Sequence, residues 1–465
     1  MSVRPAPAEG FPLSVETLVI GAGACGMVAA LAATEAGETV LVLEADPVPS
    51  GSTALSAGLI PAAGTRAQRE AGIEDDPARF AADIQAKAAQ EADPALVAAL
   101  TEEAAQTVEW LAERFGLPFS LVSDFDYPGH SRRRMHGLPT RSGAELVDAL
   151  RGACEAAGID IVCDCRAATL FTHADGRVVG VGAVRPDGSE ERIGCDRLIL
   201  ACNGYGGSKT HVAAHMPDIA EALYFGHDGN RGEALDWAAG LGARTRHLGA
   251  YQGHGNVAHP HGILITWAVI TQGGFQVNGE GVRFWNEAQG YSEAARAVLS
   301  QPGGTAVAVF DARIAAIARQ FQDFRDAQAQ GAVKSADTAE ALAQAFDLPE
   351  EAFRQTLDAV AALTAGRGAD PFGRDFAGTE PLRPPYHAVR VTGALFHTQG
   401  GLDVDGRGRV KREGGVIPNL YAAGGAACGV SGSGDAGYLS GNGLLSAVVL
   451  GRIAGSDQGW RGLEP

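Results

Sequence analysis

The sequence predicts an α/β protein of two domains, because it is long, apolar and marked by glycines at the ends of strand-like runs. The chain has 465 residues, more than one compact domain usually takes, and 46% of them are hydrophobic. Strand-like runs that turn through glycines into Ala-rich stretches occur near both ends of the chain. This alternation is typical of a sheet with parallel strands and helices on its faces.

The N-terminal run gives the clearest structural unit. Residues 15–20 form a strand-like segment, and Gly21-Ala-Gly23-Ala-Cys-Gly26 follows it. An Ala-rich helical stretch then ends near Gly37, and a second strand, residues 40–43, ends in Glu44. Strand, glycine turn, helix, strand and acid in this order predict a Rossmann-type βαβ unit that binds a dinucleotide.

Each position of this unit has a physical role. Gly21 permits a tight turn, Gly23 lets the backbone approach a pyrophosphate, and Gly26 lets helix and strand pack closely. The N-terminus of the helix faces the phosphates. Glu44 is placed to accept hydrogen bonds from the adenosine ribose, and its charge disfavours a 2′-phosphate.

Later segments favour FAD over NAD. The segment Gly51-Ser-Thr-Ala-Leu-Ser-Ala-Gly58 supplies hydroxyl groups and bare backbone where a flavin's pyrophosphate and ring would lie. A strand at residues 197–201 runs into Asn203-Gly-Tyr-Gly-Gly207, and a strand at residues 420–422 runs into Gly424-Gly425. Glycines that follow strand ends, far apart in the sequence, can converge on one extended cofactor.

Charge and composition exclude several kinds of partner. The formal charge of -18 repels nucleic acid and acidic membranes, so an anionic substrate must meet local arginines. The seven scattered cysteines fit reduced thiols in the cytoplasm better than a disulfide framework. The sequence shows neither a signal peptide nor an apolar run of membrane-spanning length. The Ala/Gln-rich region at residues 305–355 is expected to be helical.

Four segments together carry a family resemblance. The glycine fingerprint, the Gly51–Gly58 segment, His397-Thr-Gln-Gly-Gly401 and the stretch from Leu420 to Gly455 resemble the fumarate reductase/succinate dehydrogenase flavoprotein superfamily over nearly the whole chain. The resemblance implies a Rossmann-type FAD-binding domain made of two segments, with an α+β capping domain inserted between them. We place the FAD-binding segments at residues 12–249 and 391–465, and the capping domain at residues 250–390.

The same resemblance implies how the cofactor is held. Membrane-bound members attach FAD through a histidine near the Gly51–Gly58 segment, and this sequence has no histidine before His130, so we expect noncovalent FAD. The expected cofactor-binding residues are Gly21, Gly23, Gly26, Glu44, Ala45, Ser52, Thr53, Ser56, Gly58, Ala167, Ala201, Asn203, Gly204, Gly424, Gly443, Leu444 and Leu445.

The sequence departs from the fumarate-reducing branch at the reacting centre. In that branch the cap carries a histidine, a Thr-Glu pair and a proton-donating arginine, and a second arginine binds a substrate carboxylate. Here His254 and Thr266 match, but Trp267 replaces the glutamate. Tyr291 and Tyr438 stand where the two arginines would be. Fumarate-type reduction is therefore disfavoured.

The 3-ketosteroid dehydrogenase branch has tyrosines at these two places. In that branch one tyrosine removes a proton alpha to a ketone while a hydride leaves the beta carbon for flavin N5. By position, Tyr291 is the base, and Tyr438 with the Asn442 backbone N–H holds the ketone oxygen. Tyr127 is a candidate for supporting the base. An alpha C–H becomes acidic only when the developing enolate is stabilised, which gives these donors their purpose.

Other residues are expected to line the substrate pocket. His254, Thr266, Trp267 and His397 are the candidates. No metal is expected, because the histidines near residue 254 lack a patterned carboxylate. Residues 132–134 are three arginines, which form a solvated loop or, if one turns inward, meet a carboxylate of a keto acid.

The sequence thus predicts a cytoplasmic FAD-dependent enzyme that desaturates a cyclic ketone or keto acid and passes electrons to an acceptor. The alternative is a fumarate- or tricarballylate-type oxidoreductase that uses Arg283 or one of residues 132–134 in place of the missing arginines. A flavoprotein without catalytic activity is the remaining possibility.

Overall fold

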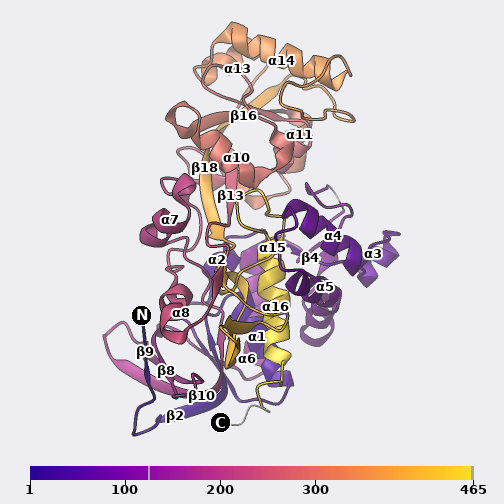
Figure 1. Ribbon diagram of the computed structural model, residues 1–465. Helices are drawn as coiled ribbons and strands as arrows, with labels where there is room; N and C mark the ends of the chain where they lie inside the picture. The colour runs from indigo at the N-terminus through magenta and orange to yellow at the C-terminus, as the bar shows by residue number, and fades with distance from the viewer. Residues whose placement is uncertain (124–125, 462–465) are drawn as a thin grey trace.

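The computed structural model describes residues 1–123 and 126–461. Two β-sheets form the centre of its two main units, which follow one another along the length of the molecule (Figure 1). The larger sheet has the strand order β1-β8-β9-β10-β2-β3-β7, with β21 beside β10 and β20 beside β21. Its strands are β1 (Ser2–Pro5), β2 (Leu13–Ile20), β3 (Val40–Leu43), β7 (Asp160–Val162), β8 (Arg166–Thr172), β9 (Val178–Val184), β10 (Glu190–Leu200), β20 (Arg409–Arg412) and β21 (Gly415–Ala422).

The predicted βαβ unit is present in this sheet. The strands β2 and β3 pair in parallel, with Ile20 opposite Leu43, and α1 (Ala24–Glu35) connects them. Both neighbours of β2 are parallel to it, and the strand ends in a fully buried run, Thr17–Ile20, as strands covered on both faces do. The Rossmann-type core expected from the glycine fingerprint is confirmed.

The helix α1 is buried on all sides, because it lies between the sheet and α16 (Leu450–Ser456). Its residues from Ala24 to Ala33 are apolar and buried, which suits a helix covered on all faces along that length. Glycines allow the close approach of the two helices: a Cβ on Gly451 would lie 2.7 Å from the Cys25 carbonyl oxygen, and one on Gly455 would lie 2.2 Å from that of Ala29. The other helices near this sheet are α2 (Gly51–Ala54), α5 (Pro94–Phe115), α6 (Gly143–Ala156), α8 (Glu233–Leu241) and α15 (Asn442–Leu444).

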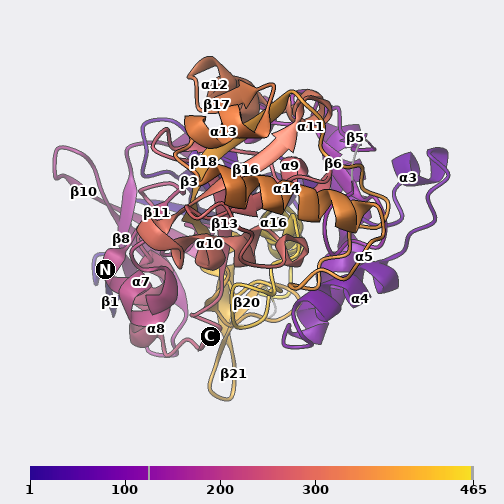
Figure 2. The same ribbon diagram turned by 90° about the horizontal axis from the view of Figure 1, so that it is seen from above.

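The smaller sheet has the order β14-β13-β18-β16-β15, with β11 and β17 also paired to β18. Its strands are β11 (Leu223–Tyr224), β13 (Tyr251–Ala258), β14 (Ile263–Leu264), β15 (Phe275–Val277), β16 (Thr305–Asp311), β17 (Val333–Ala336) and β18 (Tyr386–Thr398). Its helices are α9 (Ala268–Thr271), α10 (Tyr291–Leu299), α11 (Ala312–Ala318), α12 (Gln322–Ala329), α13 (Ala339–Ala345) and α14 (Glu350–Thr364). Seen from above, α13 and α14 lie over this unit (Figure 2).

The expectation that residues 305–355 are helical was wrong in part. This region contains β16 and β17 as well as α11 to α13, and β16 is buried over most of its length. A short apolar run such as Ala-Val-Ala-Val-Phe fits a buried strand as well as a helix, so local pattern does not decide between them.

The two sheets have separate hydrophobic cores. The core of the larger sheet includes Leu18, Val28 and Leu198, whereas that of the smaller sheet includes Phe310 and Val389. The fold is therefore an α/β unit with an α+β unit inserted into it. We propose that the inserted unit is the capping domain; its expected end at residue 390 falls within β18, which continues to Thr398.

A small side unit holds the segment before α6. It contains the sheet β4-β6-β5, formed by β4 (Ile60–Pro61), β5 (Ser120–Leu121) and β6 (Met135–Gly137). The helices α3 (Arg66–Glu70) and α4 (Pro77–Lys87) belong to it, and α7 (Lys209–His215) lies on the opposite side of the molecule (Figures 1 and 2).

Candidate active site

A cavity of about 530 Å³ is lined by residues of both units. Most of the residues predicted for cofactor binding line it: Gly21, Gly23, Glu44, Ala45, Ser52, Thr53, Ser56, Ala167, Ala201, Asn203, Gly424, Gly443 and Leu444. Residues predicted for catalysis and substrate binding line it as well: Tyr127, His254, Thr266, Trp267, Tyr291, His397 and Tyr438.

Other predicted cofactor residues lie behind the cavity wall. A Cβ on Gly26 would lie 1.8 Å from the Gly21 carbonyl oxygen, and one on Gly58 would lie 2.7 Å from that of Ser142. Likewise, a Cβ on Gly204 would lie 1.9 Å from Thr398 Oγ1. Leu445 is fully buried in the core. These positions permit close packing instead of presenting atoms to the cavity.

The glycine turn and the acid of the βαβ unit meet at one end of the cavity. Gly21 has a φ of +103°, and a Cβ there would lie 2.5 Å from the Ala201 carbonyl oxygen, so only glycine fits. The Glu44 carboxylate accepts hydrogen bonds from the backbone N–H groups of Ala22 (2.7 Å) and Asp46 (3.0 Å). Each carboxylate oxygen can accept a further bond, so Glu44 can still receive ribose hydroxyls.

Hydroxyl groups continue along the cavity from this end. Thr53 Oγ1 accepts a hydrogen bond from Ala24 N at 3.1 Å, at the start of α1. Ser52 Oγ accepts one from the Asn230 side-chain amide at 2.8 Å, and a Cβ on Gly23 would lie 3.5 Å from Thr53 Oγ1. The helix N-terminus, bare glycine backbone and hydroxyls together provide donors for a pyrophosphate.

Buried polar atoms of the cavity wall support the fit to FAD. Within the described residues, Thr398 Oγ1, Ser446 Oγ and Trp267 Nε1 are buried without a hydrogen-bond partner, and all three residues line the cavity. Buried polar groups are normally satisfied, so these atoms indicate a polar ligand. The residues present therefore fit an extended dinucleotide cofactor.

The other end of the cavity is aromatic. The His254 ring stacks between those of Tyr291 (centroids 4.9 Å apart) and Phe396 (5.1 Å). The ring of Tyr291 meets that of Tyr438 edge to face at 6.1 Å and that of Trp267 edge to face at 6.3 Å. Two phenols, far apart in sequence, thus face each other in a largely apolar chamber.

Tyr291 is held in its neutral form by burial, which raises the pKa of its phenol well above the usual value near 10. A hydrogen bond with the Ser440 side chain opposes that rise in the pKa. Tyr291 is also the first residue of α10, where the helix dipole favours negative charge. Ser440 was missed by the sequence analysis, because it lies 149 positions from Tyr291 and no local pattern links them.

The expectation for Asn442 needs correction. Its backbone N–H donates to the Leu439 carbonyl at 3.0 Å, and Asn442 does not line the cavity. The Gly443 N–H instead donates to the Tyr438 hydroxyl oxygen at 3.3 Å. The Tyr438 hydroxyl oxygen thus accepts from Gly443, which leaves the phenolic proton of Tyr438 to donate to an oxygen in the cavity. The turn of the short helix α15 decides which N–H points inward, and sequence alone does not fix it.

Asn442 belongs to a chain of hydrogen bonds behind His397. Its side-chain amide donates to Ser431 Oγ at 3.2 Å, and that hydroxyl donates to Gln399 Oε1 at 2.6 Å. The Gln399 amide lies 3.0 Å from His397 Nδ1. Burial lowers the pKa of His397 to about 4, so its ring is neutral. Asn442 thus helps to orient a residue of the cavity wall.

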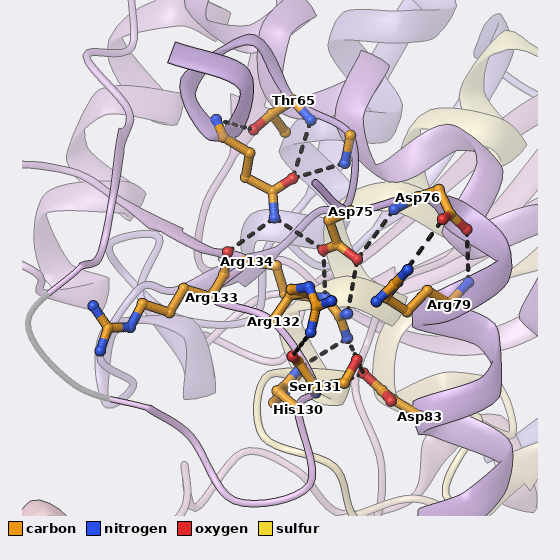
Figure 3. A network of polar contacts seen from close by, with 12 residues as sticks. Thr65, Asp75, Asp76, Arg79, Asp83, His130, Ser131, Arg132, Arg133 and Arg134 are labelled. Atoms are coloured by element: carbon orange, nitrogen blue, oxygen red, sulfur yellow. Dashed lines mark hydrogen bonds and ion pairs between the residues drawn. The ribbon is translucent and has the colours of Figure 1, made fainter. Parts of the chain in front are cut away.

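None of the three arginines of residues 132–134 lines the cavity. Arg134 is buried in ion pairs with Asp75 (2.8 Å) and Asp83 (2.6 Å) (Figure 3). Arg133 pairs with Asp126 at 2.7 Å. Arg132 is exposed, with its Nε 3.1 Å from the Glu74 carbonyl oxygen. The inward-turning alternative is wrong for this cluster, because carboxylates far away in sequence bind Arg134.

Arg283 is also committed elsewhere, to Glu287 (2.7 Å) and Asp370 (2.5 Å). The arginines that line the cavity within the described ranges are Arg141 and Arg166. Arg166 pairs with Glu233 near the nucleotide end. Arg141 is close enough to Tyr127 for its positive charge to lower the pKa of that phenol. Burial has the larger effect and raises the Tyr127 pKa. Sequence analysis gave no signal for Arg141.

Other classes of site find no support in residues 1–123 and 126–461. No cluster of three histidine, cysteine or acidic side chains suited to a metal occurs there. In the same ranges, every helix is too short or too polar to cross a membrane.

Comparison with known proteins gives a consistent family. Residues 16–444 match the model of the FAD binding domain family. A probable fumarate reductase of Shewanella frigidimarina is 30% identical over 99% of this chain and 78% of its own length. The solved open conformation of a flavocytochrome c3 fumarate reductase has a TM-score of 0.80 at 30% identity, covering 97% of this chain and 78% of that one. The 3-ketosteroid-Δ4-(5α)-dehydrogenase of Rhodococcus jostii, solved with 4-androstene-3,17-dione, has a TM-score of 0.75 at 25% identity, covering 97% of this chain and 99% of that one.

Proposed function

The chain belongs to the FAD-binding family of the fumarate reductase/succinate dehydrogenase flavoproteins. Within this family, we propose that it desaturates the α,β bond of a cyclic ketone. It is an FAD-dependent oxidoreductase; the ketone is our proposal. The pair of phenols, Tyr291 and Tyr438, in an aromatic chamber is the observation that carries it. When bound, FAD supplies the hydride acceptor, and an external electron acceptor reoxidises it.

The residues divide the work on the ketone. The Tyr438 hydroxyl, which accepts a hydrogen bond from the Gly443 N–H, donates its proton to the ketone oxygen and stabilises the negative charge that develops there. Tyr291 acts in its phenolate form, which the Ser440 side chain favours: after its own proton has passed to solvent, it takes the proton from the α carbon. His254 is neutral, since burial lowers its pKa to about 3, so it packs against Tyr291 without adding charge.

Arg141 extends the proposal to a keto acid. Its guanidinium lies by the cavity near Tyr127 in a protein with a formal charge of -18. A ring ketone bearing a carboxylate would find its local positive charge there. We also propose a cytoplasmic location, in keeping with seven free cysteines.

The test is anaerobic reduction of the bound flavin by saturated cyclic ketones, with and without a ring carboxylate. We expect bleaching with wild-type protein and its loss in Tyr291→Phe, because the phenol that accepts the proton is removed. Tyr386→Phe, at the far end of β18, is the matched control and should bleach normally. Full activity in Tyr291→Phe would refute the assignment.

The second candidate is a fumarate- or tricarballylate-type oxidoreductase. Two of the matches at 30% identity favour it, since they are named fumarate reductases. Arg141 would have to bind the carboxylate, because Arg283 and residues 132–134 are committed elsewhere. Oxidation of reduced viologen by fumarate or tricarballylate, lost in Arg141→Gln, would favour this candidate over the ketone.

A further inference from the structure

A half-buried histidine, His130, connects the loop of Tyr127 with the loop of Ser440. His130 ends a turn that begins at Tyr127: its backbone N–H donates to the Tyr127 carbonyl at 3.2 Å. Pro128 and Gly129, with φ +82° at the glycine, have the signature of a type II turn. On its other side, the His130 ring reaches the carbonyl oxygen of Ser440, 2.9 Å from Nε2.

The tautomer of His130 follows from its neighbour. Arg134 Nη1 lies 3.3 Å from His130 Nδ1 (Figure 3), and a guanidinium can only donate, so Nδ1 must accept. The proton of the neutral ring is therefore on Nε2, where it can donate to the Ser440 carbonyl. Burial lowers the pKa of His130 to about 4, which keeps the ring neutral.

Arg134 itself is fixed in place. Its Nε and Nη2 bind both oxygens of Asp75, at 2.8 and 3.0 Å, and its Nη1 binds Asp83 at 2.6 Å. The Arg134 side chain is 0% exposed, and its guanidinium lies 4.6 Å from the ring centroid of Phe80. A bidentate, buried arginine has little freedom to move, so it gives His130 a rigid support.

We propose that His130 is a positioning residue: held by Arg134, its Nε2–H fixes the Ser440 carbonyl and thereby sets the Ser440 hydroxyl against Tyr291. This inference rests on the proposed role of Tyr291 as the base. The inference goes beyond that role, because it assigns a function to the hydrogen-bond network of His130 and Arg134, which lies in the side unit and does not line the cavity. The competing view is that His130 only stabilises the fold.

The first test reads the Tyr291 phenol without any substrate. The protein is labelled with 3-fluorotyrosine, and the Tyr291 fluorine resonance is assigned from its absence in Tyr291→Phe. We expect this resonance to shift in Ser440→Ala and to shift in the same direction in His130→Asn, whose shorter amide cannot reach Ser440. His130→Gln places an amide near the Nε2 position and should leave the resonance near its wild-type place.

His136 is the matched control. It is another histidine of the side unit, 2% exposed, and it binds Thr65 Oγ1 and the Arg134 carbonyl, both at 2.9 Å. It does not line the cavity or bind Ser440. His136→Asn should lower stability without moving the Tyr291 resonance. An equal shift in His136→Asn, or an unchanged resonance in folded His130→Asn, would overturn the proposal.

A double-mutant cycle provides the second test. The maximal rate of flavin reduction by ketone should fall roughly tenfold in His130→Asn, the loss expected for one hydrogen bond, with little change in half-saturation. The double variant with Ser440→Ala should be no slower than Ser440→Ala alone, since His130 is proposed to act on Tyr291 only through the Ser440 side chain. Additive losses would show that His130 acts independently of Ser440 and would refute the inference.

The two tests separate the two claims. If the fluorine shifts follow the expected pattern but no ketone bleaches the flavin, the positioning role stands and the proposed function fails. If ketones bleach the flavin and Tyr291→Phe abolishes this, but His130→Asn behaves as wild type in both readouts, the function stands and the positioning role fails. Should His130→Asn not fold, a shift of the resonance in folded His130→Gln as large as in Ser440→Ala would overturn the role.

Discussion

Tyr291 has to meet two opposing demands, because it is buried beside the substrate and must lose its proton to act as a base. Burial disfavours the phenolate and raises the pKa, whereas the Ser440 hydrogen bond and the N-terminus of α10 favour it. The same chamber contains neutral His254 and His397, so no imidazolium helps. The balance leaves the pKa of Tyr291 above 10 in the absence of substrate.

A pH dependence follows from this balance. Below the pKa of Tyr291 the phenolate fraction grows about tenfold with each pH unit. We therefore expect kcat/KM for a cyclic ketone to rise by that factor per unit from pH 7 to pH 10. Stopped-flow reduction of the flavin across this range measures it. A plateau below pH 9 would contradict the prediction and would point to a base other than Tyr291.

At the scale of elements, the turn between β2 and α1 is the most constrained part of the cofactor site. Gly21→Ala would place a Cβ 2.5 Å from the Ala201 carbonyl oxygen on a backbone with φ +103°. We expect the variant to lose most of its FAD, because the turn and the adjoining strand must move apart. The flavin absorbance relative to protein, after gel filtration, measures the loss.

The control for this change is Gly152→Ala. Gly152 lies within α6, and a Cβ there meets nothing within 4 Å. Alanine should stabilise the helix by roughly 0.5–1 kcal/mol and leave FAD content unchanged. Equal FAD content in the two variants would show that the Gly21 turn does not shape the cofactor site.

The strands and the helix around the Gly21 turn were the part of the molecule that the sequence predicted best. Residues 15–44 carried a complete local pattern, and β2, α1 and β3 lie where it placed them. The site at the other end depends on contacts between distant positions. Such contacts include Ser440 beside Tyr291, the hydrogen bond from the Gly443 N–H to Tyr438 and the ion pairs of buried Arg134 with Asp75 and Asp83. Local periodicity contains no information about them.

At the scale of the whole molecule, histidines with lowered pKa values occur in the unit of the smaller sheet and in the side unit. Burial lowers the pKa to about 4 in His130, His136 and His397, and to about 3 in His254. They connect the side unit, the cavity wall and the second sheet. Acid should therefore act on the fold as a whole and not on one residue.

The direction of the effect is fixed by linkage. An unfolded histidine has a pKa near 6.5, so the unfolded chain binds more protons than the folded one between that value and about pH 4. The stabilisation is fully present above pH 6.5 and is lost as the pH falls through this window.

At pH 5 each of the four histidines lowers the free energy of unfolding by about 2 kcal/mol relative to pH 7. Denaturant unfolding of the FAD-loaded protein at both pH values should show a loss of several kcal/mol, smaller in His136→Asn because one of the four groups is gone. Equal stability at pH 7 and pH 5 would mean that these rings titrate normally and are not buried as described.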